Sequence, residues 1–233
     1  MPKAKMSKIP FPLAKKPFQR IFIDTLPGTI KDLNLESRPF PCYLFIVDQY
    51  TRWIALVGMW GYSSKAAVDS LTKWYTQNGG IVKLQMIEYV RSDAGTQFTS
   101  EEFQAFCQLH TIKCELAAPK HQEMNSICES NIKRVKYMSK KLLIQAGLSK
   151  HFQYFARRYA IYIFNVMPTG ALRKEQRKLT TPFELIHSYK PSLTKYHKFG
   201  CPVVFKNTMW TLHPPNKMLE GYLLASQPTR LDI

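Results

Sequence analysis

The chain has 233 residues, of which 33 are Lys or Arg and 16 are Asp or Glu, so its formal net charge is +17. Apolar types make up 45% of the chain, which excludes global disorder, and the length allows one full domain and a small second one. No run approaches the ~18 consecutive apolar residues of a transmembrane helix, so no membrane association is expected. The charge favours a polyanionic partner, nucleic acid first; a basic protein without a specific partner is the alternative.

The predicted elements begin with a basic arm over residues 1–17, which lacks the apolar stretch of a secretory signal. A strand over 20–24 and a loop over 27–41 follow. Two apolar runs, 42–47 and 53–60, are joined by a short polar segment, which predicts a hairpin. The first run is apolar throughout, as expected for a strand buried on both faces.

Helices and strands then alternate. In chain order we expect a helix capped by Ser63 or Ser64 and ended by residues 78–80, a strand over 84–90, a helix with a capping box of Thr99 and Glu102, a strand over 111–116, helices over 123–146 and 150–167, and a strand from 201. This order predicts an α/β domain with a mixed sheet and helices on its faces.

The cysteines are odd in number and form no CxxC pair, so neither a disulfide framework nor a Cys-rich zinc site is expected. They are predicted to be mostly small core residues, in a protein of a reducing compartment. These residues are Cys42, Cys107, Cys114, Cys128 and Cys201.

Three acids stand where predicted strands and helices begin or end. Asp24 closes the first strand, Asp93 follows the fourth, and Glu129 lies on the long helix, with 35 residues between the last two. Strand ends in α/β sheets present ligand crevices, and the Ala-Gly after Asp93 makes a sharp turn that allows close approach. Converging carboxylates need cations, and two Mg²⁺ or Mn²⁺ ions suit phosphodiester chemistry. The alternative is that each acid is a cap or a solvated turn residue.

Several segments resemble the integrases of retroviruses and, most closely, of copia-type long-terminal-repeat retrotransposons. Residues 91–135 are similar to the pattern in which SDxGxxF is followed by SAP and QxNGxxER. Residues 46–65 resemble the family's FVDDYSR hairpin, and 163–205 and 217–226 are similar to segments typical of copia-type elements. The resemblance spans roughly residues 17–225.

The resemblance implies an RNase H-like fold, a mixed five-stranded sheet flanked by helices, with a partial C-terminal extension. It implies three regions: a basic arm over 1–17, the catalytic core over 18–170, and a basic linker with a partial C-terminal region over 171–233. It also implies a multimer that binds double-stranded DNA and works in the nucleus after a cytoplasmic stage in a virus-like particle.

Carried over residue by residue, the resemblance gives Asp24, Asp93 and Glu129 the role of ligands to two Mg²⁺ or Mn²⁺ ions. The implied reactions are removal of nucleotides from the 3′ ends of the element and attack of the new 3′-OH on target DNA. Asp48 aligns with a polar hairpin position, and we interpret it as a turn-forming residue.

Basic residues follow the last acid along the long helix. Lys133 and Lys136 lie four and seven residues after Glu129, on one helix face, and Lys140 continues the basic run. Lysines at the first two offsets contact the element's DNA end in retroviral relatives, so the resemblance implies the same here. The alternatives are a solvated basic face and an i,i+4 ion pair of Glu129 with Lys133.

Four further residues are candidates for DNA contact. Gln122 and Asn125 occupy the family's mobile-loop position and either bind DNA or cap the helix. Arg173 and Lys174 belong to a second basic run, predicted to be a surface loop near DNA.

Some positions depart from the family pattern. Ser126 stands where Gly is usual, Ser130 replaces the Arg of the ER pair, and Ala94 stands where Asn is common. The paired His and Cys of the zinc domain are not found, and we expect a C-terminal barrel to be incomplete. Two alternatives stay open: a catalytically decayed integrase fragment that only binds DNA or supports assembly, and a nuclease without joining activity.

Overall fold

The computed structural model describes residues 13–28, 40–77, 86–116, 126–170, 172, 179–192, 197–206 and 218–223. Its elements are β1 (Arg20–Pro27), β2 (Cys42–Asp48), β3 (Ile54–Met59), α1 (Ser64–Gln77), β4 (Tyr89–Ser92), α2 (Thr96–Thr99), α3 (Glu101–Leu109), β5 (Lys113–Leu116), α4 (Ser126–Ala146), η3 (Lys150–Phe152), α5 (Gln153–Val166), α7 (Pro182–His187), β6 (Pro202–Lys206) and β7 (Met218–Tyr222). Within these ranges, no helix combines the length and apolar character needed to cross a bilayer.

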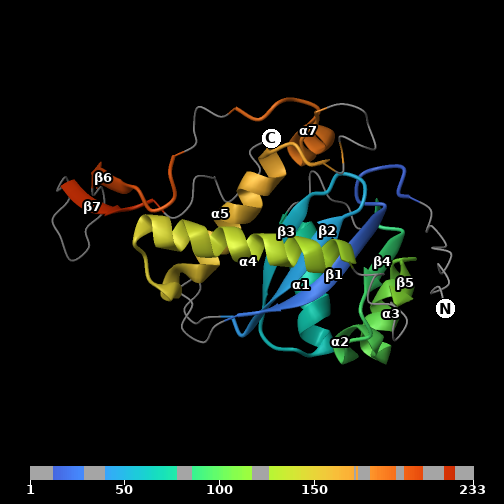
Figure 1. The fold of residues 1–233 in the computed structure, drawn as a ribbon. Helices are drawn as coiled ribbons and strands as arrows, with labels where there is room; N and C mark the ends of the chain where they lie inside the picture. The colour runs from blue at the N-terminus through green and yellow to red at the C-terminus, as the bar shows by residue number, and fades with distance from the viewer. Residues whose placement is uncertain are drawn as a thin grey trace, which may run out of the picture.

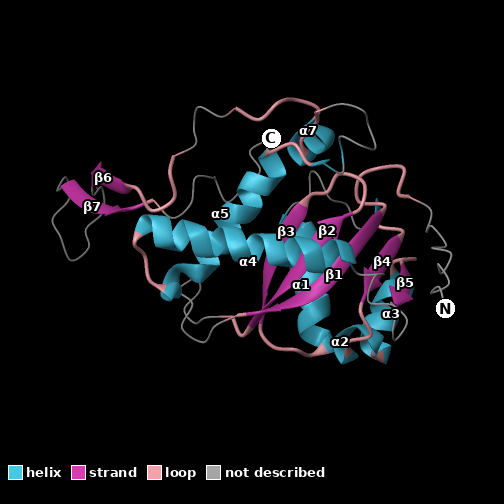
Figure 2. Cartoon of the chain, viewed as in Figure 1, coloured by secondary structure: helices cyan, strands magenta, loops and turns pink. Residues whose placement is uncertain are grey.

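Five strands form one mixed sheet in the order β3-β2-β1-β4-β5 (Figure 2). β2 pairs antiparallel with both β1 and β3, which confirms the predicted hairpin. β4 pairs parallel with both β1 and β5. Parallel neighbours need crossover connections, and α1 and then α2 with α3 provide them. The expected mixed five-stranded sheet flanked by helices is confirmed.

Helices cover both faces of this sheet, with α1 and α3 on one side and α4 and α5 on the other (Figure 1). Every residue of β2 is therefore buried, as its apolar sequence predicts. Alternate residues of β1 enter the two cores: Ile21 and Ile23 face α1 and α3, whereas Phe22 and Leu26 face α4 and α5. Asp24 lies between Phe22 and Leu26 in this alternation and takes the α4 face.

Three element boundaries that bear on the candidate acids differ from expectation. β1 extends to Pro27 instead of ending at residue 24, because pairing with β2 continues that far, so Asp24 lies inside the strand and does not close it. The capping box of Thr99 and Glu102 was wrong: Ser100 is the N-cap of α3, and its side chain accepts a backbone N–H of that helix at 3.3 Å. The cause is the fully buried Phe98, which the extra turn α2 holds in the core. β4 also lies later than the expected 84–90, so the chain leaves the sheet directly before the second candidate acid.

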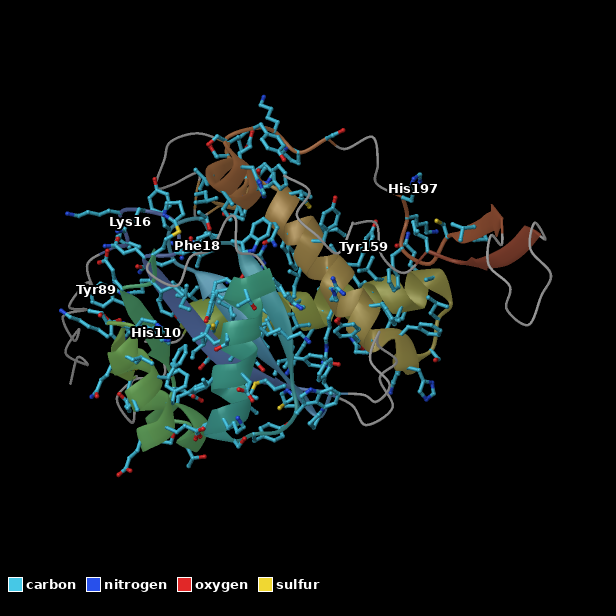
Figure 3. The ribbon with its side chains drawn as sticks, turned by 180° about the vertical axis from the view of Figure 1, so that it is seen from behind. Lys16, Phe18, Tyr89, His110, Tyr159 and His197 are labelled. Atoms are coloured by element: carbon cyan, nitrogen blue, oxygen red, sulfur yellow. The ribbon has the colours of Figure 1, made fainter. Side chains whose placement is uncertain are left out.

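The chain after α5 returns to the α4 and α5 side. α7 begins with a capping box of Thr181 and Glu184, and β6 and β7 form a separate antiparallel pair. Phe199, 2% exposed, packs against Tyr159 of α5, and the Tyr159 hydroxyl donates to the carbonyl of His197 (Figure 3). These contacts attach the segment before β6 to α5. The predicted domain boundary after α5 stays a prediction.

Candidate active site

The register of β1 and β4 brings two candidate acids to one level of the sheet. Parallel backbone pairing matches Phe22 with Arg91 and ends there. The same register, continued by two residues, sets Asp24 opposite Asp93. Neighbouring strands lie ~4.8 Å apart, so like charges meet at the point where the two strands stop pairing.

The electrostatics of Asp24 place the other two acids beside it. Burial is the main cause that raises the pKa of Asp24 to about 6, and the negative charges of Asp93 and Glu129 raise it as well. The backbone N–H of Thr25, which donates to Asp24 Oδ1 at 2.7 Å, and the charge of Lys136 lower it. All three acids and one lysine of α4 therefore lie within electrostatic range of one another.

The start of α4 supplies the third acid. Cys128, in the first turn of α4, is fully buried against the sheet and so fixes this end of the helix. Burial and the negative charges of the three acids raise the pKa of its thiol. The next residue, Glu129, lies in the first turn of α4, where the helix dipole stabilises a negative charge. In the described part of α4, no ion pair joins Glu129 to Lys133, so the i,i+4 alternative is not observed.

The donor set suits a hard divalent cation. Asp93 is exposed and accepts the backbone N–H of Gly95 at 3.2 Å. Among the described residues, no three His, Cys, Asp or Glu side chains are close enough to hold a metal ion, so the acids do not form a closed ligand set. Carboxylate oxygens of like charge fit Mg²⁺ or Mn²⁺, whose charge offsets their repulsion.

Two polar residues beside these acids were not singled out by the sequence. Nε2 of Gln97, on α2, donates to Oγ1 of Thr25 on β1 at 3.1 Å. The sequence signal for this contact was Gly95, two residues after Asp93. A Cβ at Gly95 would lie 2.7 Å from Nε2 of Gln97 and 3.0 Å from Oδ1 of Asp93. The space that the glycine leaves at this turn is therefore occupied by the side chain of Gln97.

The candidate basic residues of α4 are exposed. Lys133, Lys136 and Lys140 lie on the solvent side of the helix, and Lys136 acts on the charge of Asp24. The other candidates for DNA contact lie outside the described residues; these are Gln122, Asn125, Arg173 and Lys174.

Asp48 has a structural position. It is 1% exposed, and its Oδ1 accepts the backbone N–H of Phe18 at 3.0 Å. Its Oδ2 accepts the backbone N–H of Thr51 at 2.8 Å and the hydroxyl of the same residue at 2.6 Å. The interpretation as a turn-forming residue is confirmed, and Asp48 also ties the segment before β1 to the hairpin.

Residues 14–122 match the family described as Integrase core domain. This segment, slightly under half of the chain, is similar to integrase core domains. The matched range contains Asp24 and Asp93 and all five strands of the sheet, whereas Glu129 lies beyond it.

The curated proteins to which the chain is similar include plant retrotransposon polyproteins. The Pol polyprotein of transposon RE2 from Arabidopsis thaliana is 24% identical over 201 residues, which cover 84% of this chain and 13% of that protein. The Pol polyprotein of transposon TNT 1-94 from Nicotiana tabacum is 28% identical over 115 residues, which cover 49% and 8%. The chain thus spans about an eighth of the length of the first relative.

Solved integrase structures share the fold. The HTLV-2 integrase catalytic core domain in complex with magnesium has a TM-score of 0.53 at 16% identity, over 74% of this chain and 99% of that one. The simian T-cell lymphotropic virus intasome in complex with PP2A regulatory subunit B56 gamma has a TM-score of 0.57 at 15% identity, over 88% and 69%. The sheet and its flanking helices are therefore the RNase H-like fold of integrase catalytic cores.

Proposed function

We propose that the chain is the integrase region of a long-terminal-repeat retrotransposon polyprotein, and that it catalyses metal-dependent 3′-end processing and strand transfer of element DNA. The integrase core domain and the plant relatives support the general assignment. The observation that carries the reaction is the register of β1 and β4, which sets Asp24 level with Asp93 at the side of the sheet that α4 covers. The influence of Asp93 and Glu129 on the pKa of Asp24 agrees with this geometry.

In this proposal Asp24, Asp93 and Glu129 hold two Mg²⁺ or Mn²⁺ ions, which activate the attacking oxygen and stabilise the leaving oxygen of a phosphodiester. Partial burial of Asp24 strengthens its attraction for a cation, because the local dielectric constant is lower than in water. β1 and the end of β4 orient Asp24 and Asp93, and the buried Cys128 orients the helix turn that carries Glu129.

The two reactions use the same groups. In 3′-end processing, water attacks a phosphodiester near the element end, a P–O bond forms, and the shortened strand leaves with a free 3′-OH. In strand transfer, that 3′-OH attacks a target phosphodiester, and the displaced 3′ oxygen of the target strand takes up a proton.

The proposed DNA contacts lie beside these acids. Lys133, Lys136 and Lys140 bind phosphates of double-stranded DNA, and this is supported by their exposure and by the net charge of +17. Further contacts are proposed for the residues outside the described ranges, which are Gln122, Asn125, Arg173 and Lys174. The proposal includes a homo-multimer acting in the nucleus after a cytoplasmic stage in a virus-like particle.

The test is a strand-transfer assay with the full 233-residue chain, Mg²⁺ or Mn²⁺, a donor duplex carrying the element end, and a plasmid target. Asp93→Asn and Glu129→Gln should each reduce joining by at least ~100-fold, since even groups behind the metal ligands contribute 10–100-fold. Glu102→Gln, an exposed glutamate of α3, is the matched control and should leave joining unchanged. Full activity of Asp93→Asn or Glu129→Gln would contradict the assignment.

A non-catalytic module is the second candidate, because Ser126 and Ser130 depart from the family pattern next to Glu129. It predicts salt-dependent DNA binding by the wild-type chain, no joined product with either metal, and binding that ignores Asp93→Asn. Products cut but never joined would instead indicate a nuclease of the same fold.

A further inference from the structure

The pairing of β1 with β4 stops before it reaches Asp24 and Asp93. Past Phe22, β1 has no backbone partner in β4, although it stays paired with β2 as far as Pro27. Asp24 and Asp93 repel each other across this gap. Since β1–β4 pairing does not reach the two acids, a side-chain contact between these segments can adjust their separation.

A polar bridge spans this gap. The bridge consists of Gln97 and Thr25: Nε2 of Gln97 donates to Oγ1 of Thr25 at 3.1 Å, and the backbone N–H of Thr25 donates to Oδ1 of Asp24 at 2.7 Å. On the other side, the Gln97 amide and Oδ1 of Asp93 both lie within 3.0 Å of the position that a Cβ on Gly95 would occupy. The amide of Gln97 thus contacts β1 next to Asp24 and lies beside the turn that follows Asp93.

We propose that Gln97 is a positioning residue that sets the separation of Asp24 and Asp93, and through it the affinity of the acids for a divalent cation. This inference rests on the proposed function, because it assumes that these acids are metal ligands. Gln97 suits the role because its amide donates a hydrogen bond without adding a fourth negative charge to the site.

The short helix α2, which contains Gln97, holds the backbone of the bridge in place. α2 has only four residues, and its next residue, Phe98, is fully buried in an edge-to-face contact with Phe103 of α3, with ring centroids 5.5 Å apart. Because Phe98 cannot move without opening the core, the backbone of Gln97 is fixed relative to β4. The hydrogen bond from the Gln97 side chain to Thr25 then connects β1 to this fixed backbone.

The test measures binding of Mn²⁺ alone to the full 233-residue chain, by calorimetric titration and by the metal-dependent rise in melting temperature. Gln97→Leu and Thr25→Val should each weaken Mn²⁺ binding by ~10-fold, the lower end of the range for groups that orient metal ligands. The double variant should bind no more weakly than either single variant, because both remove the same hydrogen bond. Thr25→Ser keeps the hydroxyl and should bind as the wild type does.

The matched control is Gln153→Leu. Nε2 of Gln153 also donates to a hydroxyl, that of Ser139, at 2.8 Å, but Ser139 lies ten residues beyond Glu129 on α4, ~15 Å along the helix. This control should leave Mn²⁺ affinity unchanged. Melting without metal checks that each variant folds, and Thr25→Val decides the question if Gln97→Leu does not fold.

The outcomes separate the inference from the function on which it rests. If Asp93→Asn abolishes Mn²⁺ binding while Gln97→Leu and Thr25→Val bind normally, the positioning role is wrong and the proposed metal site stands. Additive losses in the double variant would likewise overturn the bridge. A wild-type chain that binds no Mn²⁺ would overturn both proposals.

Discussion

Two groups of charged residues lie on one face of the sheet, and they are built in opposite ways. At the arginine end (Arg20, Arg91 and Glu115), two almost fully buried guanidinium groups share one carboxylate, with contacts of 2.9 Å from Arg20 and 3.6 Å from Arg91. At the acid end (Asp24, Asp93 and Glu129), three carboxylates act on one another.

The difference separates stability from function. At the arginine end one carboxylate offsets part of the positive charge of two guanidinium groups, and its removal leaves two buried positive charges without their shared negative partner. Charges at the acid end repel, so the folded chain gains stability when a cation binds. Loss of a charged side chain should therefore lower the free energy of unfolding at the arginine end. At the acid end, it should raise the free energy of unfolding of the metal-free chain, because it removes a repulsion.

The largest effect on stability is expected at the arginine end. Glu115→Ala should lower the free energy of unfolding by about 3 kcal/mol, because Arg20 and Arg91 are 3% and 2% exposed and lose their shared partner. Urea denaturation measures this loss. Glu101→Ala, an exposed acid of α3, is the control and should stay within about 0.5 kcal/mol of wild type. A loss below about 1 kcal/mol for Glu115→Ala would show that the arginines do not depend on it.

A pH series sharpens the comparison, because Asp48 is a buried acid next to the arginine end. Burial raises its pKa to about 6, against the hydrogen bonds from Thr51, Tyr50 and Phe18. The unfolded chain loses this proton near pH 3.8, so the contribution to stability is present below that pH and is lost as pH rises through about 6.

The wild-type free energy of unfolding should therefore fall between pH 4 and 7, with a contribution from Asp48 on the order of 2 kcal/mol. Asp48→Asn should remove that part of the slope, because the amide does not titrate. Chemical denaturation at several pH values measures the slope. An unchanged slope in Asp48→Asn would refute the assignment.

The acid end should respond with the opposite sign. Asp24→Asn should raise the free energy of unfolding of the metal-free chain by about 1 kcal/mol at pH 7, a figure reduced for the partial exposure of Asp24. It should also abolish stabilisation by Mn²⁺. Thermal melts with and without Mn²⁺ measure both effects, and a less stable metal-free variant would show that Asp24 supports the fold.

The smallest effect on stability is expected for Lys136→Ala on the exposed side of α4. The free energy of unfolding should change by less than about 0.5 kcal/mol, whereas the slope of log affinity for duplex DNA against log salt should become shallower by about one. Lys65→Ala, an exposed lysine of α1 on the other face of the sheet, is the control. A salt series of binding isotherms measures the slopes, and equal slopes would remove Lys136 from the DNA interface.

The sequence predicted most of the sheet, because its strands are apolar runs bounded by turns. It placed Asp93 correctly after the fourth strand, whereas Asp24, expected to close the first strand, lies within β1, which stays paired with β2 as far as Pro27. The predicted capping box of Thr99 and Glu102 was wrong. Thr99 and Ser100 can both serve as an N-cap, and the burial of Phe98 places Thr99 in α2 and leaves Ser100 as the N-cap of α3.

Contacts between distant polar residues could not be predicted from one sequence. Gln97 and Thr25 are 72 positions apart, and Arg20 and Glu115 are 95 apart. Neither pair leaves a periodic signal, because each joins different elements across the sheet. The approach of Glu129 to Asp24 also depends on how α4 packs through the buried Cys128. Only the resemblance to integrases brought these acids together in advance.

The most direct measurement is a crystal structure of the full chain grown with Mn²⁺, with the ions located by anomalous scattering. We predict Mn²⁺ within about 2.2 Å of carboxylate oxygens of Asp24 and Asp93, with Glu129 as a further ligand. Anomalous density only elsewhere on the chain, with the three carboxylates left apart, would contradict the proposed active site.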